Sequence, residues 1–270
     1  MIKIFSEFLT EHKLHKNIYQ FLDYIEDLSK NKVFIFIDTE TSGLGGPKKQ
    51  QLTQVSAVGF EYDFQQNNFK EFGTFNKKIK ISADQKGRLA NPKDDIYRAF
   101  RFNHYGNKIK EDPKYYDEEQ VLSEFRNWVA HAGYYFDPLL IMQNASFDMN
   151  MMAGRSDKKL NYEVLDTKRV IQLFIIPIIQ KLAETDSKYQ EVLDKIGTST
   201  ASSVKSARDN GLTTSAMGKC APFFNLDMRG YHDGLTDCRI TADMFTKMIA
   251  FIKENSDLDI SKYQVIRIKN

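Results

Sequence analysis

Two carboxylates stand one residue apart in the segment FIDTETSGL, where Asp38 and Glu40 directly follow the apolar run KVFIFI. Alternate residues of an extended chain point to the same side, so the two carboxylates are expected to converge on one point. Like charges held this close repel each other unless a cation lies between them. Carboxylate oxygens suit Mg2+ or Mn2+ better than Zn2+. The pair indicates a candidate divalent-metal site, and a solvent-exposed acidic turn is the alternative.

Three further residues could join such a site. Asp148 follows the apolar run LLIM in QNASFDMNMM, where Asn144 and Ser146 can start a helix and place Asp148 in its first turn. His232 and Asp237 lie in HDGLTD, directly before and within the start of the last helix. A histidine titrates near neutral pH and can take a proton from water. The alternatives are carboxylates that only complement helix dipoles and a surface histidine.

The set and its order resemble the DEDDh family of 3′–5′ exonucleases, which have a ribonuclease H-like fold and include the proofreading epsilon subunit of bacterial DNA polymerase and stand-alone or phage exonucleases. FIDTETSGL resembles the first motif, QNASFDMNMM the second, and HDGLTD the third. LDTKRVIQL, with Asp166, resembles the strand and helix that follow the second motif. The resemblance spans roughly residues 32 to 252. It departs from the family at Gln143, where histidine is frequent, and in a longer polar stretch over 185–215.

The resemblance implies a mechanism with two divalent cations, Mg2+ or Mn2+. The expected metal ligands are Asp38, Glu40, Asp148 and Asp237, and the expected general base is His232. The reaction would hydrolyse phosphodiester bonds from the 3′ end of nucleic acid, single-stranded DNA favoured, and release 5′-mononucleotides. The candidate substrate contacts are Thr41, Ser42, Leu44, Asn144 and Phe147. For Phe147 a place in the core is an equal alternative.

Two other functions stay open at this stage. An RNA-trimming exoribonuclease would use the same metal chemistry and differ only in how its cleft treats the 2′-hydroxyl. A catalytically silent nucleic-acid-binding or virion-internal protein could share the fold. Clustered carboxylates without a cation would destabilise such a protein, so the retained acidic residues argue against it.

The elements that position these residues follow from the apolar patterns. Short β-branched and aromatic runs predict strands, and apolar stripes at helical spacing predict helices. The predicted strands are 32–37, 52–62, 69–75, 139–142 and 163–165, and the predicted helices are 117–129, one from about 146, 167–182 with a bend near Pro177, and 234–253. These elements predict an α/β fold of the ribonuclease H-like class, a mixed five-stranded sheet flanked by helices.

Residues 1–31 are expected to form an N-terminal helical extension, and 32–270 the exonuclease domain. The start, MIKIFSEFLTE, resembles the capsid-targeting peptides of tailed-phage internal head proteins, which are cut after a glutamate that would be Glu11 here. A plain amphipathic helix is the alternative. A phage origin would place the protein in the host cytoplasm or packaged in the virion.

Composition narrows the protein class. Cys220 and Cys238 form no CxxC pair, which favours a reducing, cytoplasmic setting, and no apolar run reaches the roughly 20 residues of a membrane helix. The formal net charge is only +2, but basic residues outnumber acidic ones between Lys77 and Lys110. That segment could meet phosphates or be a solvated face.

Overall fold

The computed structural model describes residues 17–42, 49–82, 115–134, 136–153, 162–197, 220–229 and 233–263. The predicted cleavage site at Glu11 and most of the basic segment after Lys80 therefore lie outside the described residues. Within the described part, no helix combines the length and apolarity that crossing a membrane requires.

Five strands form one sheet in the order β3-β2-β1-β4-β5. The central strand β1 (Lys32–Thr41) pairs antiparallel with β2 (Leu52–Asp63) and parallel with β4 (Asp137–Met142). The edge strands are β3 (Asn68–Lys78), antiparallel to β2, and β5 (Glu163–Asp166), parallel to β4. This arrangement confirms the predicted α/β fold with a mixed five-stranded sheet flanked by helices.

The central strand is longer than its apolar run predicts. Its pairing with β2 continues past Ile37 to Thr41, opposite Leu52. Asp38 and Glu40 are therefore residues of the strand itself. The prediction that they follow the strand was wrong. Extended pairing fixes the direction of both side chains more firmly than a loop would.

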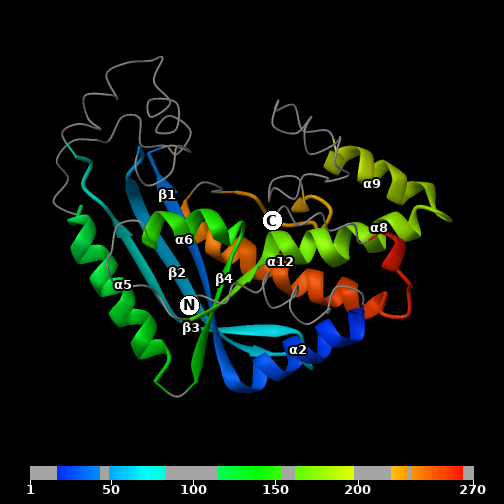
Figure 1. The fold of residues 1–270 in the computed structure, drawn as a ribbon, viewed down its shortest axis with the longest axis horizontal. Helices are drawn as coiled ribbons and strands as arrows, with labels where there is room; N and C mark the ends of the chain where they lie inside the picture. The colour runs from blue at the N-terminus through cyan, green and yellow to red at the C-terminus, as the bar shows by residue number, and fades with distance from the viewer. Residues whose placement is uncertain are drawn as a thin grey trace, which may run out of the picture.

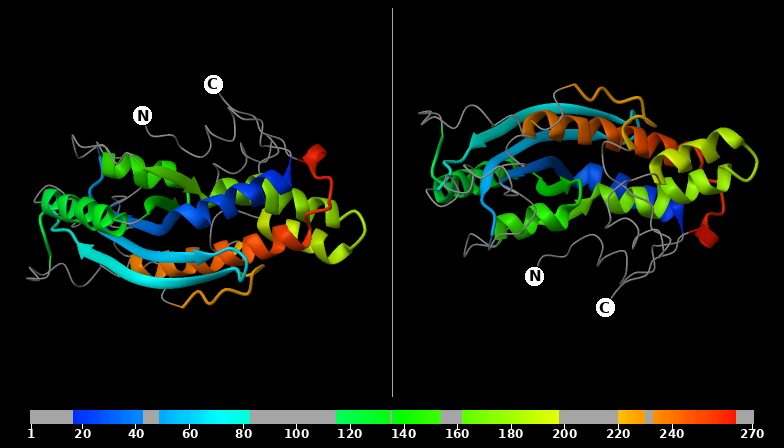
Figure 2. Two further views of the ribbon diagram at one scale, coloured as in Figure 1. Left: turned by 90° about the horizontal axis from the view of Figure 1, so that it is seen from below. Right: turned by 90° about the horizontal axis from the view of Figure 1, so that it is seen from above.

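Helices cover both faces of the sheet (Figures 1 and 2). One face carries α2 (Ile18–Asn31) and α12 (Gly234–Glu254), and the other carries α5 (Glu118–Ala132) and α6 (Ala145–Ala153). Alternate residues of β1 divide between two cores: Phe34 and Phe36 pack with the α12 side, and Ile35 and Ile37 pack with the α5 and α6 side. This alternation is what a central strand buried on both faces requires.

The N-terminal helix α2 belongs to the larger core. Asn17 caps it by accepting hydrogen bonds from the backbone N–H groups of Tyr19 (2.9 Å) and Gln20 (3.4 Å). Its buried stripe consists of Ile18, Phe21, Leu22, Ile25 and Leu28. Phe21 stacks on Phe174 with ring centroids 4.3 Å apart, which ties the helix to the segment after β5.

The predicted helix over 167–182 is present with a local distortion. Thr167–Val170 (α7) and Ile176–Leu182 (α8) are α-helical, and Ile171–Ile175 between them winds as a π-helix. Pro177 has no N–H to offer the carbonyl four residues earlier, so the wider turn lies where an α-helical bond is missing. The chain continues through α9 (Ser187–Gly197), and a short 3-10 turn, Ser261–Tyr263, ends the described part.

Candidate metal centre

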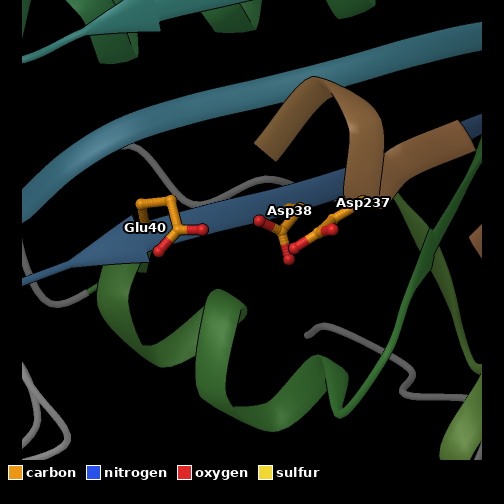
Figure 3. A group of neighbouring side chains, drawn as sticks. All are labelled: Asp38, Glu40 and Asp237. Carbon is orange, nitrogen blue, oxygen red and sulfur yellow. The ribbon is translucent and has the colours of Figure 1, made fainter. Parts of the chain in front are cut away.

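Three of the predicted metal ligands come together. Asp38 and Glu40 near the end of β1 and Asp237 in the first turn of α12 each offer a carboxylate oxygen, and these oxygens all lie within 4.8 Å of one another. In Figure 3, Asp38 and Asp237 point toward each other and Glu40 lies further along β1. Asp237 is about 200 residues from Asp38 in the sequence, and the two come together because the start of α12 packs directly on the sheet.

Two features fix the start of α12. The side chain of Asp233 accepts hydrogen bonds from the backbone N–H (3.3 Å) and hydroxyl (3.1 Å) of Thr236 and caps the helix. Next to it, a Cβ on Gly234 would lie 2.6 Å from the Ser56 hydroxyl oxygen and 3.4 Å from Asp38 Oδ2. The helix can approach the sheet this closely only because position 234 has no side chain. This approach brings Asp237 within reach of Asp38.

Asp148 joins the centre through Thr39, the residue between Asp38 and Glu40. Asp148 lies in the first turn of α6, as predicted, and only 4% of its surface is exposed. One of its carboxylate oxygens accepts hydrogen bonds from the backbone N–H (3.1 Å) and hydroxyl (2.6 Å) of Thr39. Among the described residues, the group of oxygens within 4.8 Å does not include Asp148. Asp148 is therefore not a member of that group, but it is joined to the strand that carries Asp38 and Glu40 by its hydrogen bonds with Thr39.

Burial and repulsion from nearby carboxylates raise the pKa values of Asp38, Glu40 and Asp148. Burial, followed by repulsion from Asp148, Glu40 and Asp237, raises the pKa of Asp38 well above its ordinary value. Burial and repulsion from Asp237 and Asp148 raise the pKa of Glu40 to about 8. Burial also raises the pKa of Asp148 to about 7, although the hydrogen bonds from Thr39 oppose that rise.

These carboxylates suit a divalent cation. A cluster whose ionised form is disfavoured by burial and repulsion is stabilised when a cation neutralises it. The donors are all carboxylate oxygens, the ligand type that Mg2+ and Mn2+ prefer. The residues present therefore fit the predicted metal.

A second buried carboxylate supports the turn that precedes α6. One oxygen of Asp166 accepts hydrogen bonds from the backbone N–H groups of Asn144 and Lys168, each at 3.0 Å. The side-chain ammonium of Lys168 donates to Asn144 Oδ1 at 2.9 Å, and Asn144 has a φ of 70°. Because Asn144 stands four residues before Asp148, these bonds hold the turn that starts the helix carrying it.

The predicted substrate contacts differ in how far they are buried and in whether the structure describes them. Thr41 and Ser42 are buried, and the Ser42 hydroxyl donates to Gln50 Oε1 (3.0 Å) and accepts from the Gln51 N–H (2.9 Å). Phe147 is half-buried against the core beside α5 and α6. Leu44 and the predicted base His232 lie outside the described residues. Contact of these residues with substrate stays a prediction.

Sequence reasoning missed Thr39 and Gly234. Thr39 had a usable signal, because the residue between two converging carboxylates must face the opposite side of the strand, where α6 lies. Gly234 follows the N-cap residue Asp233, and an Asp-Gly pair before a helix gives no indication of which strand the helix start contacts.

No family model matches the chain, and no curated protein matches it in sequence. Among the solved structures that are similar to it are two of low sequence identity. Cell-death related nuclease 4 (CRN-4) aligns with a TM-score of 0.47 and 16% identity over 82% of this chain and 64% of its own, so this chain spans less than two thirds of it. S. pombe Pop2p in its Mg2+- and Mn2+-bound form aligns with a TM-score of 0.46 and 12% identity over 90% and 92% of the two chains. Likeness at this level carries no functional weight, and the proposal below rests on the residues of this chain.

Proposed function

We propose that this protein is a metal-dependent 3′–5′ exonuclease that hydrolyses phosphodiester bonds from the 3′ end of nucleic acid, with single-stranded DNA the favoured substrate and 5′-mononucleotides the products. The observation that carries the proposal is the approach of the Asp38, Glu40 and Asp237 oxygens to within 4.8 Å of one another. A divalent cation would neutralise the charge of such a group, and metal ions held by carboxylates can promote the in-line attack of water on a phosphodiester.

The convergence of the three motif-like segments supports the same proposal. Their acidic residues lie on β1, α6 and α12, and they meet through the carboxylate group and through the hydrogen bonds from Thr39 to Asp148. Chance acidic residues at strand ends and helix starts would have no reason to converge from three separate elements. The meeting of all three therefore favours a shared chemical role.

The chain's own residues would divide the work. Asp38, Glu40 and Asp237 would hold a divalent cation, with Asp148 supporting a second. When bound, Mg2+ or Mn2+ would polarise the scissile phosphate and stabilise the charge on the leaving oxygen. His232 directly precedes the N-cap residue of α12 and would take a proton from the attacking water.

The test uses 3′- and 5′-labelled single-stranded DNA and RNA oligonucleotides of matched sequence, with Mg2+ or Mn2+. We expect stepwise shortening from the 3′ end, loss of shortening in Asp38→Asn, and a rate decrease of roughly 10²- to 10⁴-fold in His232→Ala. The matched control is His131→Ala, which removes an exposed histidine from the last turn of α5.

The outcomes separate the candidate functions. Faster shortening of RNA would favour the exoribonuclease. Binding of both polymers without shortening under either metal would contradict the exonuclease and favour a binding protein of the same fold.

A further inference from the structure

Two rows of side chains cross the sheet from the carboxylates to the edge strand. In the pairing of β1, β2 and β3, Asp38 lies opposite Ser56, which lies opposite Asn76. One step further along, Glu40 lies opposite Gln54, which lies opposite Lys78. Residues paired across neighbouring strands point to the same face of a sheet, so Asn76 and Lys78 share the face of the metal-binding carboxylates.

Hydrogen bonds lock the middle of these rows. Gln54 Nε2 donates to Ser56 Oγ (3.1 Å) and to Asn76 Oδ1 (2.8 Å), and Ser56 Oγ donates to Asn76 Oδ1 (3.1 Å). Gln54 and Ser56 are buried, with 2% and 0% of their surface exposed. Because Asn76 Oδ1 accepts both bonds, the amide cannot turn freely and its Nδ2 is directed away from the buried pair.

At the edge strand both rows end in exposed groups that attract anions. Asn76 and Lys78 are exposed, one with an oriented amide donor and the other with an ammonium group. Adjacent strands lie about 4.8 Å apart, so these residues stand about 10 Å from the carboxylates across two strand spacings.

We propose that Asn76 and Lys78 form a subsite for a backbone phosphate of the nucleic-acid strand, next to the nucleotide that is removed. The inference rests on the proposed exonuclease function for the identity of the ligand. An oriented N–H donor beside a cation is the usual recognition of a phosphate oxygen, and such contacts fix the register of a strand without reading its sequence. The subsite would hold the strand while its end lies at the carboxylates.

The main variant is Asn76→Asp, because it separates binding from folding. One carboxylate oxygen can still accept from Gln54 and Ser56, while the other replaces the amide donor with a negative charge facing the phosphate. We expect affinity for a 5′-fluorescein single-stranded oligonucleotide, measured by fluorescence anisotropy in an Asp38→Asn background that keeps the oligonucleotide intact, to fall at least about tenfold. Asn68→Asp makes the same change at the far end of β3 and should bind like the parent protein.

The second variant is Lys78→Gln, and the quantity measured is the salt dependence of its affinity for the oligonucleotide. Losing one phosphate contact should reduce the slope of log affinity against log salt concentration by about 0.7 for a single strand. The matched control is Lys70→Gln, which removes another exposed lysine of β3, one that pairs with Glu61 of β2, and should leave the slope unchanged.

Two results would overturn the subsite: Asn76→Asp binding as tightly as Asn68→Asp, or an unchanged salt slope in Lys78→Gln. The measurements do not depend on cleavage. If the native protein binds the oligonucleotide through Asn76 and Lys78 but never shortens it, the exonuclease proposal fails and the subsite stands. If it shortens the strand while both variants bind normally, the subsite fails and the exonuclease stands.

Discussion

Gly234, the first residue of α12, lies so close to Ser56 on β2 that a Cβ at position 234 would stand 2.6 Å from the Ser56 hydroxyl oxygen and 3.1 Å from Ser56 Cβ. Cβ atoms do not approach other atoms to 2.6 Å, so any side chain here would push the helix away from the sheet. Asp237 lies three residues further along, in the same first turn of α12. The distance between Asp237 and Asp38 therefore depends on the missing side chain of Gly234.

We expect Gly234→Ala to weaken metal binding and catalysis more than folding. Overpacking costs about 1–3 kcal/mol of folding free energy, whereas a displacement of about 1 Å at a reacting centre can lower the rate about 10²-fold. Mn2+ affinity by calorimetry, nuclease rate and thermal unfolding would be compared. Gly73→Ala is the control, because among the described residues its Cβ would meet only Trp128, at 3.9 Å.

The double variant Gly234→Ala with Ser56→Gly checks the cause. Removing the Ser56 side chain removes both close contacts, so Mn2+ affinity should recover toward that of Ser56→Gly alone. If the double variant is no better than Gly234→Ala, the loss arises from something other than the contact with Ser56.

Thr39→Val should move the pH dependence of activity. The hydroxyl of Thr39 donates to Asp148 at 2.6 Å and lowers the pKa of Asp148, which burial otherwise raises to about 7. Without the hydroxyl the pKa should rise further, so the fraction of ionised Asp148 at neutral pH falls and the acidic limb of the pH–rate profile moves to higher pH. Leaving the buried carboxylate with one bond fewer should also lower the free energy of unfolding by about 1–3 kcal/mol.

Thr39→Ser keeps the hydroxyl and is the matched control. It should retain the position of the acidic limb even if the lost methyl group lowers stability. A profile that moves equally in both variants would show that packing of Thr39 matters, and not its hydrogen bond to Asp148.

Asp166→Ala should loosen the turn before α6. The Asp166 oxygen that accepts from Asn144 and Lys168 would be lost, leaving two backbone N–H groups without that acceptor and Asn144 without support for its φ of 70°. We expect a loss of about 1–3 kcal/mol in the free energy of unfolding, measured by urea titration. We also expect a lower kcat, because α6, the helix that carries Asp148, begins at this turn. Asp166→Asn keeps an acceptor oxygen and should retain most of both; equal losses in the two variants would contradict the role of the acceptor.

Strand alternation alone predicted that Asp38 and Glu40 converge, whereas the resemblance to the DEDDh exonucleases added Asp237 to them. The structure brings carboxylate oxygens of all three residues close together. The run KVFIFI predicted a strand buried on both faces, and this strand is β1. The extension of β1 to Thr41 could not be predicted, because the polar residues DTET carry no apolar signal and are strand only through pairing with β2.

The register between neighbouring strands also could not be predicted from the sequence. The register that places Ser56 opposite both Asp38 and Asn76 depends on irregularities between Glu40 and Thr41 and between Gly59 and Phe60. A shift of one residue reverses which face a side chain occupies, so no row across three strands can be derived from alternation alone.

The raised pKa values predict how stability changes with pH when metal is removed. Burial raises the pKa of Asp38, that of Glu40 to about 8 and that of Asp148 to about 7, whereas these groups titrate near pH 4 in an unfolded chain. Between about pH 4 and pH 8 the folded state therefore holds more protons than the unfolded state. The free energy of unfolding should decrease as the pH rises through this window.

A divalent cation binds the ionised carboxylates, so its stabilising effect should grow over the same window. We expect the melting temperature in EDTA to fall from pH 5 to pH 8, and the increase produced by Mg2+ to become larger at each step. Glu40→Gln removes one titrating group and should flatten the EDTA curve while reducing the Mg2+ effect. A melting temperature in EDTA that is constant or rises over this range would mean that these carboxylates are already ionised in the folded protein without metal.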